Sequence, residues 1–280
     1  MEFLRKIFTK KPKVDWDKVR QDLEPKIVDI GKPAVRLRSS ESKTRCKFGG
    51  APFVNSSNFV WPYSDGKPMA FLGQIDLEEI AEVHKYEWLN GKGLLLFFYD
   101  VETMPWGFDP KDKGKWSVLL QNLPDCYARF PGDLDTGHIL KEKYLKPTLV
   151  SLYPNYDDPS IENLNLSEEE LDLYIDLCTA NEECQHQVGG FPSPVQGNYM
   201  ELESQLASNG VYVGDSKGYA SEKAKKLESG SSDWRLLLQF DSDEDLDVMW
   251  GDCGMIYFWV QRQKSLKNEF GNCWLILQCC

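Results

Sequence analysis

The sequence has few of the residues and motifs on which most enzyme signatures depend. Only three of its 280 residues are histidine, and its eight cysteines form no Cys-x-x-Cys pair. No Cys/His spacing fits a structural zinc site. The phosphate-binding patterns Gly-x-Gly-x-x-Gly and Gly-Lys-Ser/Thr are missing as well. These absences leave no motif that requires a cofactor, and we predict none.

Long apolar runs are also absent. No segment reaches the ~18–20 apolar residues of a membrane-spanning helix, and the start of the chain lacks the apolar stretch of a secretory signal. The cysteines are therefore expected to be free thiols of a cytoplasmic protein. Cys279 and Cys280 follow an apolar run, which favours a buried strand end over lipid attachment.

Basic residues are outnumbered, with 32 Lys and Arg against 44 Asp and Glu, so the net charge is −12. A chain this acidic repels nucleic-acid phosphates, and we predict no nucleic-acid partner. The first 13 residues hold the one basic cluster and an apolar helical face. Residues 1–13 could therefore touch a membrane surface, although packing on the protein body is the favoured alternative.

Four sequence blocks occur twice in the same order. Each copy begins with Gly-Gly-x-Pro, continues with a strand that contains glutamine, and adds a glycine-led apolar run and a last strand that ends in glutamine. This pattern predicts a duplicated unit. The blocks of the two copies are Gly49–Pro52 and Gly189–Pro192, Phe71–Asp76 and Leu236–Asp241, Gly93–Phe98 and Gly254–Trp259, and Trp116–Gln121 and Trp274–Gln278.

The repeat predicts an α+β fold of two similar antiparallel β-rich units in one compact body. Capping-box patterns predict helices over 76–89 and 167–180 that bridge the units. The second copy carries an insertion, residues 197–232, predicted to begin with a helix at Asn198. The expected segments are an N-terminal helical arm (1–45), a first repeat unit (46–121), a connector with a helix (122–185) and a second repeat unit (186–280).

Gln74 and Gln239 occupy the same place in two apolar strands. A buried amide must be hydrogen-bonded, so each glutamine either pairs with nearby backbone, the favoured alternative, or lines a cleft between the units. Aromatic and polar groups near loops, as in binding pockets, add further candidates for that cleft. They are His186, Trp250, Asp252 and Trp61.

The acidic run 241–247 suggests a metal site with Asp241, Asp243 and Asp252 as ligands. A calcium loop needs glycine at its sixth position, which is Leu246 here. The repeat also aligns Asp241 with Asp76 and Glu244 with Glu79. We therefore expect a helix-capping box at Asp241 and treat metal binding as the less favoured alternative.

Together these blocks resemble the YwqG-like family of mostly bacterial proteins without an assigned activity. The resemblance covers residues 46 to 280 except the insertion. It implies an α+β protein and transfers no catalytic residues. The motifs that carry it are Lys47–Gly50 with Pro52, Trp61–Pro62, Phe71–Leu77, Gly93–Phe98, His186–Pro192, Leu237–Asp243 and Trp250–Gly254.

Two functions of different classes remain open, of which the first is favoured and the second is the alternative. The first is a non-enzymatic binding or protein-interaction module that uses the cleft between the units; the charge alone adds an immunity-like role against a basic toxin. The second is a hydrolase or metal-dependent enzyme centred on His186, Asp241 and Asp252. The partner and the oligomeric state are left open.

Overall fold

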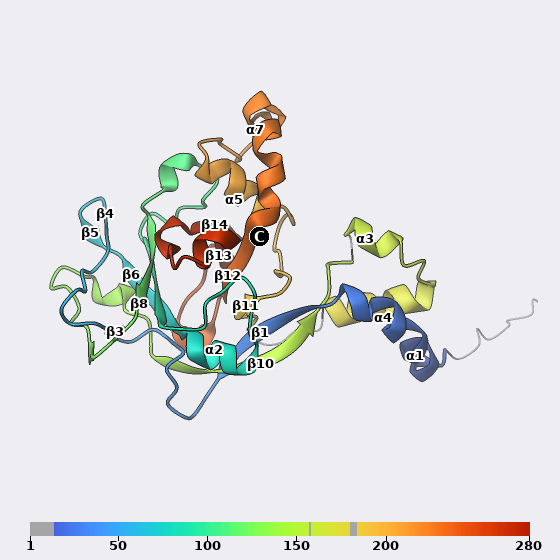
Figure 1. Ribbon diagram of the computed structural model, residues 1–280, viewed down its shortest axis with the longest axis horizontal. Coiled ribbons are helices and arrows are strands. Elements are labelled where there is room, and N and C mark those ends of the chain that lie inside the picture. Colours follow the sequence, from blue (N-terminus) through green and yellow to red (C-terminus); the bar gives the residue numbers. More distant parts are fainter. Residues whose placement is uncertain (1–13, 157, 180–183) are drawn as a thin grey trace, which may run out of the picture. The chain divides into compact units, whose positions relative to one another are not determined.

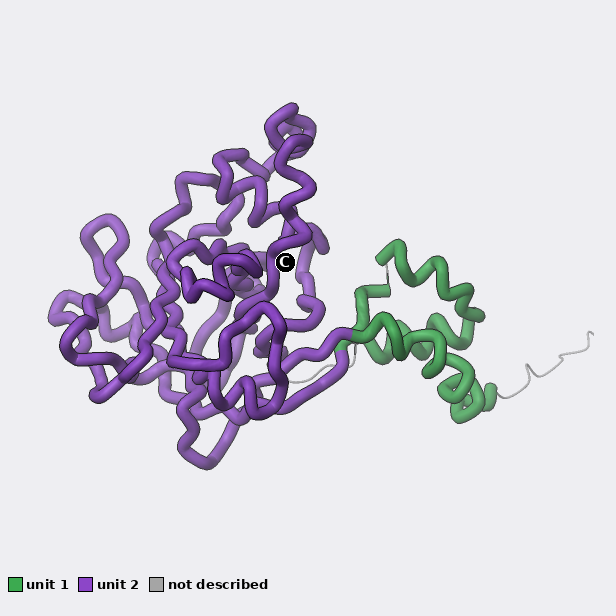
Figure 2. The backbone as a smooth tube through the Cα atoms, viewed as in Figure 1, with its two compact units in different colours: residues 1–31, 152–181 green, residues 32–151, 182–280 purple. Residues whose placement is uncertain are grey.

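The computed structural model describes residues 14–156, 158–179 and 184–280. The predicted surface helix in residues 1–13 lies outside these residues. The chain divides into two compact units, which Figure 2 colours separately. Unit 1 comprises 1–31 and 152–181, and unit 2 comprises 32–151 and 182–280.

Unit 1 is helical. Its elements are α1 (Trp16–Ile27), the 3₁₀ helix η1 (Val28–Ile30), α3 (Pro159–Glu162) and α4 (Glu168–Thr179). Leu23 and Ile27 of α1 are buried with Leu173 and Tyr174 of α4. The capping box predicted at Ser167 is confirmed: Glu170 N–H donates to Ser167 Oγ (3.2 Å), and Ser167 N–H donates to Glu170 Oε2 (2.7 Å).

Unit 2 is built on one large, strongly curved sheet (Figure 1) with the strand order β14-β13-β12-β11-β1-β10-β2-β6-β7-β8. Two further two-stranded sheets are formed by the hairpin β4-β5 and by the pair β3-β9, whose strands are far apart in the sequence. The strands are β1 (Lys32–Ser39), β2 (Lys47–Phe48), β3 (Phe53–Val54), β4 (Tyr63–Ser64), β5 (Lys67–Pro68), β6 (Ala70–Asp76), β7 (Leu94–Tyr99), β8 (Trp116–Gln121), β9 (Cys126–Tyr127), β10 (Lys143–Leu152), β11 (Gln187–Gly189), β12 (Trp234–Asp241), β13 (Met255–Gln261) and β14 (Trp274–Gln278).

Two runs of four antiparallel strands form most of this sheet. We call β2-β6-β7-β8 the first half-sheet and β11-β12-β13-β14 the second half-sheet. The register shifts by one residue between Phe71 and Gly73 in the first and between Leu236 and Leu238 in the second. In both, the shift directly precedes the glutamine that the sequence singled out.

The curvature brings the two edges of the sheet together. Trp116 of β8 donates its indole N–H to Cys273 O (3.0 Å), and its ring lies 5.0 Å from that of Trp274. The half-sheets also share one interior, since Phe97 of β7 packs on Phe258 of β13 with ring centroids 5.0 Å apart. The mixed helix and strand content and the antiparallel pairing agree with the predicted α+β class.

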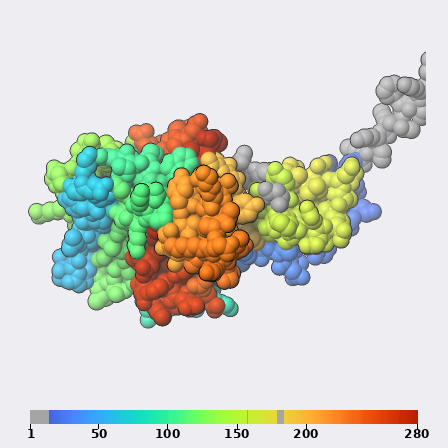
Figure 3. Space-filling model, turned by 90° about the horizontal axis from the view of Figure 1, so that it is seen from above, coloured from blue at the N-terminus to red at the C-terminus, as the bar shows by residue number. Residues whose placement is uncertain are grey.

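Helices of unit 2 cover parts of the sheet. α5 packs against β12 and β14, and the residues of α5 to α7 reach the molecular surface next to the C-terminal strands (Figure 3). The α-helices are α2 (Leu77–Val83), α5 (Met200–Ser208), α6 (Ser216–Ala220), α7 (Glu222–Leu227) and α8 (Arg262–Ser265); the 3₁₀ helices are η2 (Pro110–Asp112), η3 (Thr136–His138), η4 (Glu228–Asp233), η5 (Glu244–Leu246) and η6 (Phe270–Asn272).

Several predicted elements are wrong in type or extent. The prediction of a helical arm is wrong at residues 32–39, because they form β1. Val35 and Leu37 of this strand are buried in the core cluster of the sheet. The connector contains β10, a ten-residue strand. The helix expected over 76–89 ends at Val83. The insertion helix begins at Met200, without a side-chain cap, instead of at Asn198.

Candidate functional site

The two glutamines make the same pair of contacts in their half-sheets. Gln74 donates to Arg45 O (2.8 Å) and accepts from Phe53 N–H (2.9 Å). Gln239 donates to Gln185 O (2.6 Å) and accepts from Ser193 N–H (2.9 Å). Both side chains are buried. Each amide thus joins the segments before and after a Gly-Gly turn; that either binds a ligand stays a prediction.

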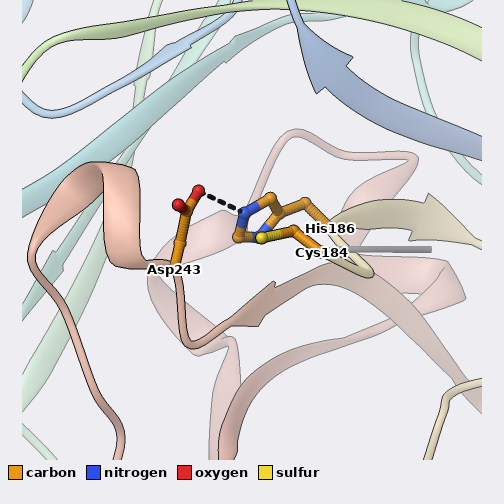
Figure 4. A group of neighbouring side chains, drawn as sticks. All are labelled: Cys184, His186 and Asp243. Atoms are coloured by element: carbon orange, nitrogen blue, oxygen red, sulfur yellow. Dashed lines mark hydrogen bonds and ion pairs between the residues drawn. The ribbon is translucent and has the colours of Figure 1, made fainter. Parts of the chain in front are cut away.

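His186 lies just before β11 and uses both ring nitrogens. Its Nδ1 accepts from the backbone N–H of Asp241 (3.1 Å). Because that nitrogen is an acceptor, the proton of the neutral ring resides on Nε2, which faces Asp243 Oδ2 at 3.1 Å (Figure 4). The ring is 2% exposed, and burial lowers the pKa of His186. The histidine is therefore neutral and hydrogen-bonded on both sides.

Asp243 is the centre of this polar cluster. Besides His186 it contacts Lys143 Nζ (2.7 Å), and its Oδ1 accepts from Asp245 N–H (2.9 Å) at the start of η5. Burial opposes its ionisation, but hydrogen bonds from His186 and Lys143 outweigh burial and hold the pKa of Asp243 well below its usual range. Asp243 is therefore the ionised partner of Lys143.

Cys184, His186 and Asp243 each place one potential ligand atom within 4.8 Å of the others. Three properties of this group bear on metal binding. Burial raises the pKa of Cys184 to about 11, so a metal ion would have to displace the thiol proton to bind this sulfur. Binding at Nε2 of His186 would leave an imidazolate, because Nδ1 already accepts an N–H. Lys143 supplies the positive charge beside Asp243, so the present bonding does not fit a metal ion.

The predicted role of Asp241 is wrong. Asp243, not Asp241, caps η5, and Asp241 Oδ2 accepts from Gln185 N–H (2.8 Å) instead. The capping position has moved two residues along the chain relative to Asp76, which does cap α2. Asp252 is exposed in the turn before β13. In the residues that the structure describes, no hydrogen bond joins Asp252 to His186 or Asp241.

The two candidate tryptophans are core residues. Trp61 donates to Met69 O (2.9 Å) and packs against Phe98 in a smaller cluster. Trp250 is 1% exposed, packs on Tyr99 and Phe240, and its indole N–H has no hydrogen-bond partner in the described part of the chain. Their proposed contact with a ligand stays a prediction.

A Gly-x-Ser-x-Gly sequence, the pattern of a nucleophilic serine, occurs once at Gly214–Gly218. A nucleophile elbow needs a strand before the serine and a helix after it. Here Ser216 is exposed, begins the short helix α6 and follows no strand. Asp215 accepts from Lys217 N–H (2.9 Å) as the helix cap. The geometry is that of a cap.

A cavity with a volume of about 880 Å³ lies elsewhere among the described residues. None of the six predicted cleft residues lines it. It is bordered by residues 84–88 after α2, by Gly189 and Gly190, by residues 198–202 at the start of α5, and by residues 231–236. These segments come from both predicted repeat units. We call this cavity the aromatic pocket; its aromatic residues are Tyr86, Trp88, Tyr199, Trp234 and Trp259.

Bare backbone forms part of the pocket wall. Gly189 has φ +66°, and a Cβ there would meet the Tyr86 ring at 2.6 Å. Tyr86 Oη donates to Val188 O (2.7 Å), so the ring is held against this turn. Tyr199, which also borders the pocket, is 67% exposed. The Gly-Gly repeat could have identified Gly189 and Gly190 as part of the pocket. Tyr86 and Trp88 could not be identified from the sequence, because their spacing is that expected at the end of the predicted helix.

Charges of both signs border the aromatic pocket. The basic residues are Lys32, Lys85 and Arg235, and the acidic ones are Glu87 and Glu201. Burial raises the pKa of Glu201, although Lys32 and Arg235 oppose this. A ligand can therefore find donors, acceptors and aromatic faces in one place.

The comparisons with known proteins give a family without an activity. The model of a domain of unknown function, DUF1963, matches residues 46–279, so the chain belongs to that family. No curated protein matches the chain.

Proposed function

We propose that this DUF1963 protein is a non-enzymatic binding module that holds a segment of a partner protein in the aromatic pocket. The observation that carries the proposal is the pocket of about 880 Å³ with five aromatic residues on its walls. Of the polar residues that suggested catalysis, His186 and Asp241 instead bond to backbone and to Asp243, and Asp252 is exposed apart from them. Binding needs only such a shaped surface, whereas catalysis needs a reactive group.

The composition of the pocket favours a protein as the partner. Tyr, Trp and Arg are the residues that dominate binding energy at protein interfaces, and all three types line the pocket. Tyr199 exposes a large aromatic surface, which a partner would cover. The mixed charges of Lys32, Arg235, Glu87 and Glu201 suit a peptide segment, which carries donors and acceptors along its backbone. The net charge of −12 favours a basic partner, which keeps the immunity-like role within the proposal.

We also propose that the two half-sheets descend from one copied module. Three parallels support it: the register shift beside each glutamine, the identical amide contacts of Gln74 and Gln239, and two successive glycines with positive φ in each Gly-Gly turn. A third contact matches too, since Gln121 and Gln278 each accept backbone N–H groups from the segment after the turn. The likeness to the YwqG-like group stays a prediction alongside this proposal.

A cytoplasmic location is part of the same proposal. All eight cysteines are free, which suits a reducing compartment. No helix in the described part of the chain is long and apolar enough to cross a membrane. The absence of a nucleic-acid partner stays a prediction from the net charge.

The alternative, a hydrolase or metal-dependent enzyme centred on His186, Asp241 and Asp252, has one observation in its favour. The ligand atoms of Cys184, His186 and Asp243 lie close enough for a metal ion. Stoichiometric zinc or manganese in purified protein, lost in Asp243→Asn, would favour this alternative over the binding module.

Affinity capture from a native lysate tests the binding module. Tyr199→Ala removes an exposed aromatic side chain of the pocket, and Tyr156→Ala removes one from unit 1 as a matched control. We expect a specific partner with the wild type and the control, and at least a tenfold loss of its affinity with Tyr199→Ala, or about 1.4 kcal/mol. Equal capture by all three proteins would contradict the pocket as the binding site.

A further inference from the structure

Two exposed cysteines lie beside each other at one end of the second half-sheet. The β13–β14 register pairs Met255 with Gln278. Beyond this pair, Cys280 N–H donates to Asp252 O (3.3 Å). Standard backbone geometry then places the Cα atoms of Cys253 and Cys280 about 5–7 Å apart, close to the ~4.4–6.8 Å that disulfides span.

Exposure separates this pair from the other thiols. Cys253 and Cys280 are the exposed cysteines, whereas Cys46, Cys273 and Cys279 are buried. Cys279 is buried although it is the direct neighbour of Cys280 in the chain, so the two adjacent thiols differ in access to solvent. Burial also raises the pKa of Cys273 and Cys46, which keeps those sulfurs as unreactive thiols.

We propose that Cys253 and Cys280 form a dithiol site that reacts with low-molecular-weight disulfides to give an internal disulfide. The thiolate of one cysteine attacks a sulfur of the small disulfide, forms a mixed disulfide and releases one small thiolate. The second cysteine, as thiolate, attacks the protein sulfur of the mixed disulfide and releases the other small thiolate. Two protein thiols are oxidised, one small disulfide is reduced, and the two protons pass to the released thiolates.

The internal disulfide would join the turn at residues 250–254 to the end of β14. That turn already approaches β14 closely, since a Cβ on Gly254 would lie 2.6 Å from Cys279 Cβ. The site is independent of the aromatic pocket, because neither cysteine lines it.

The test exposes the folded full chain to oxidised glutathione, blocks the remaining thiols and maps the peptides without reduction. We expect a Cys253–Cys280 link in the wild type and in Cys279→Ser, the adjacent buried control. Cys253→Ser should lose the link and retain glutathione on Cys280. Cys253 is exposed, so Cys253→Ser should fold, and circular dichroism checks the fold of both variants. A glutathione adduct without the link in the wild type, a Cys279–Cys280 link, or dimers joined through these cysteines would each overturn the proposal.

Discussion

The two half-sheets meet the same backbone requirement with different side chains. In the first, Cys46 Sγ accepts the N–H of Asp76 (3.2 Å); in the second, His186 Nδ1 accepts the N–H of Asp241 (3.1 Å). Each acceptor stands three residues before a positive-φ glycine, Gly49 or Gly189. In the first half-sheet the acceptor is a thiol, which brings no second ring nitrogen. In the second half-sheet the imidazole of His186 has a further nitrogen, Nε2, which also needs a hydrogen-bond partner. The buried Asp243–Lys143 pair follows from that difference.

The largest expected effect comes from breaking this extra network. Asp243→Ala leaves His186 Nε2–H without its acceptor and Lys143 without its buried partner, and breaking such a pair costs about 3–5 kcal/mol. Its counterpart, Asp76→Ala, removes a helix cap and a bond to a half-exposed Arg45, for which we expect about 1–2 kcal/mol. Urea unfolding of both variants measures the two free-energy losses.

A matched control accompanies Asp243→Ala. Asp245 contacts the same lysine (2.9 Å), but its side chain is 76% exposed. Asp245→Ala should cost less than about 1 kcal/mol. If Asp243→Ala fails to fold, Asp243→Asn provides the measurement, since its amide oxygen can still accept from His186. Equal losses in the free energy of unfolding for Asp243→Ala and Asp76→Ala would contradict an additional stabilising contribution from the Asp243 network.

Gln74 and Gln239 should contribute equally to the free energy of unfolding, in contrast to the two different acceptors Cys46 and His186. Gln74→Leu leaves Phe53 N–H and Arg45 O unpaired, and Gln239→Leu does the same to Ser193 N–H and Gln185 O. Each change should cost about 1–3 kcal/mol, because buried polar groups lose their partners. Losses that differ by more than about 1 kcal/mol between the two variants would argue against equivalent sites.

The sequence was sufficient to predict the main strands, but not the capping role of Asp243 or the residues of the aromatic pocket. The strands were predictable, because β7 and β13 are almost entirely apolar and β6 and β12 are mainly apolar runs that contain one glutamine each. Asp243 was missed as the cap because alignment of the repeats favours Asp241, and only the three-dimensional position of His186 explains the shift of two residues. The pocket residues Tyr86 and Arg235 were missed because a loop, an insertion and a strand meet there, and none of these segments carries a shared pattern.

The pH dependence of the free energy of unfolding should also differ between the two half-sheets, by less than the effect of Asp243→Ala. Burial lowers the pKa of His186, so as pH falls below about 6.5 the unfolded chain takes up the proton first and stability falls. The slope is at most about 1.4 kcal/mol per pH unit. Burial raises the pKa of Cys46 well above its usual value, so the corresponding acceptor of the first half-sheet contributes no such slope near neutral pH.

The difference between wild type and His186→Gln isolates this contribution. Burial raises the pKa of Glu203 to about 7, and this group acts with the opposite sign: its stabilisation is lost as pH rises through 7. It is present in both proteins and cancels in the difference. A wild type and variant with parallel stability curves between pH 5 and 7 would show that His186 does not titrate in the way that its burial requires.

The smallest expected effect concerns the acceptor role of Cys46. Cys46→Ser keeps an acceptor for Asp76 N–H, so it should cost less than about 1 kcal/mol. Cys273 is the control, because it is equally buried but no hydrogen bond to its sulfur is present in the described residues. Cys273→Ser therefore buries a hydroxyl without a partner, at a cost of about 1–3 kcal/mol. If urea unfolding gives equal losses, residue 46 does not act as an acceptor, and its correspondence with His186 would be limited to position in the sheet.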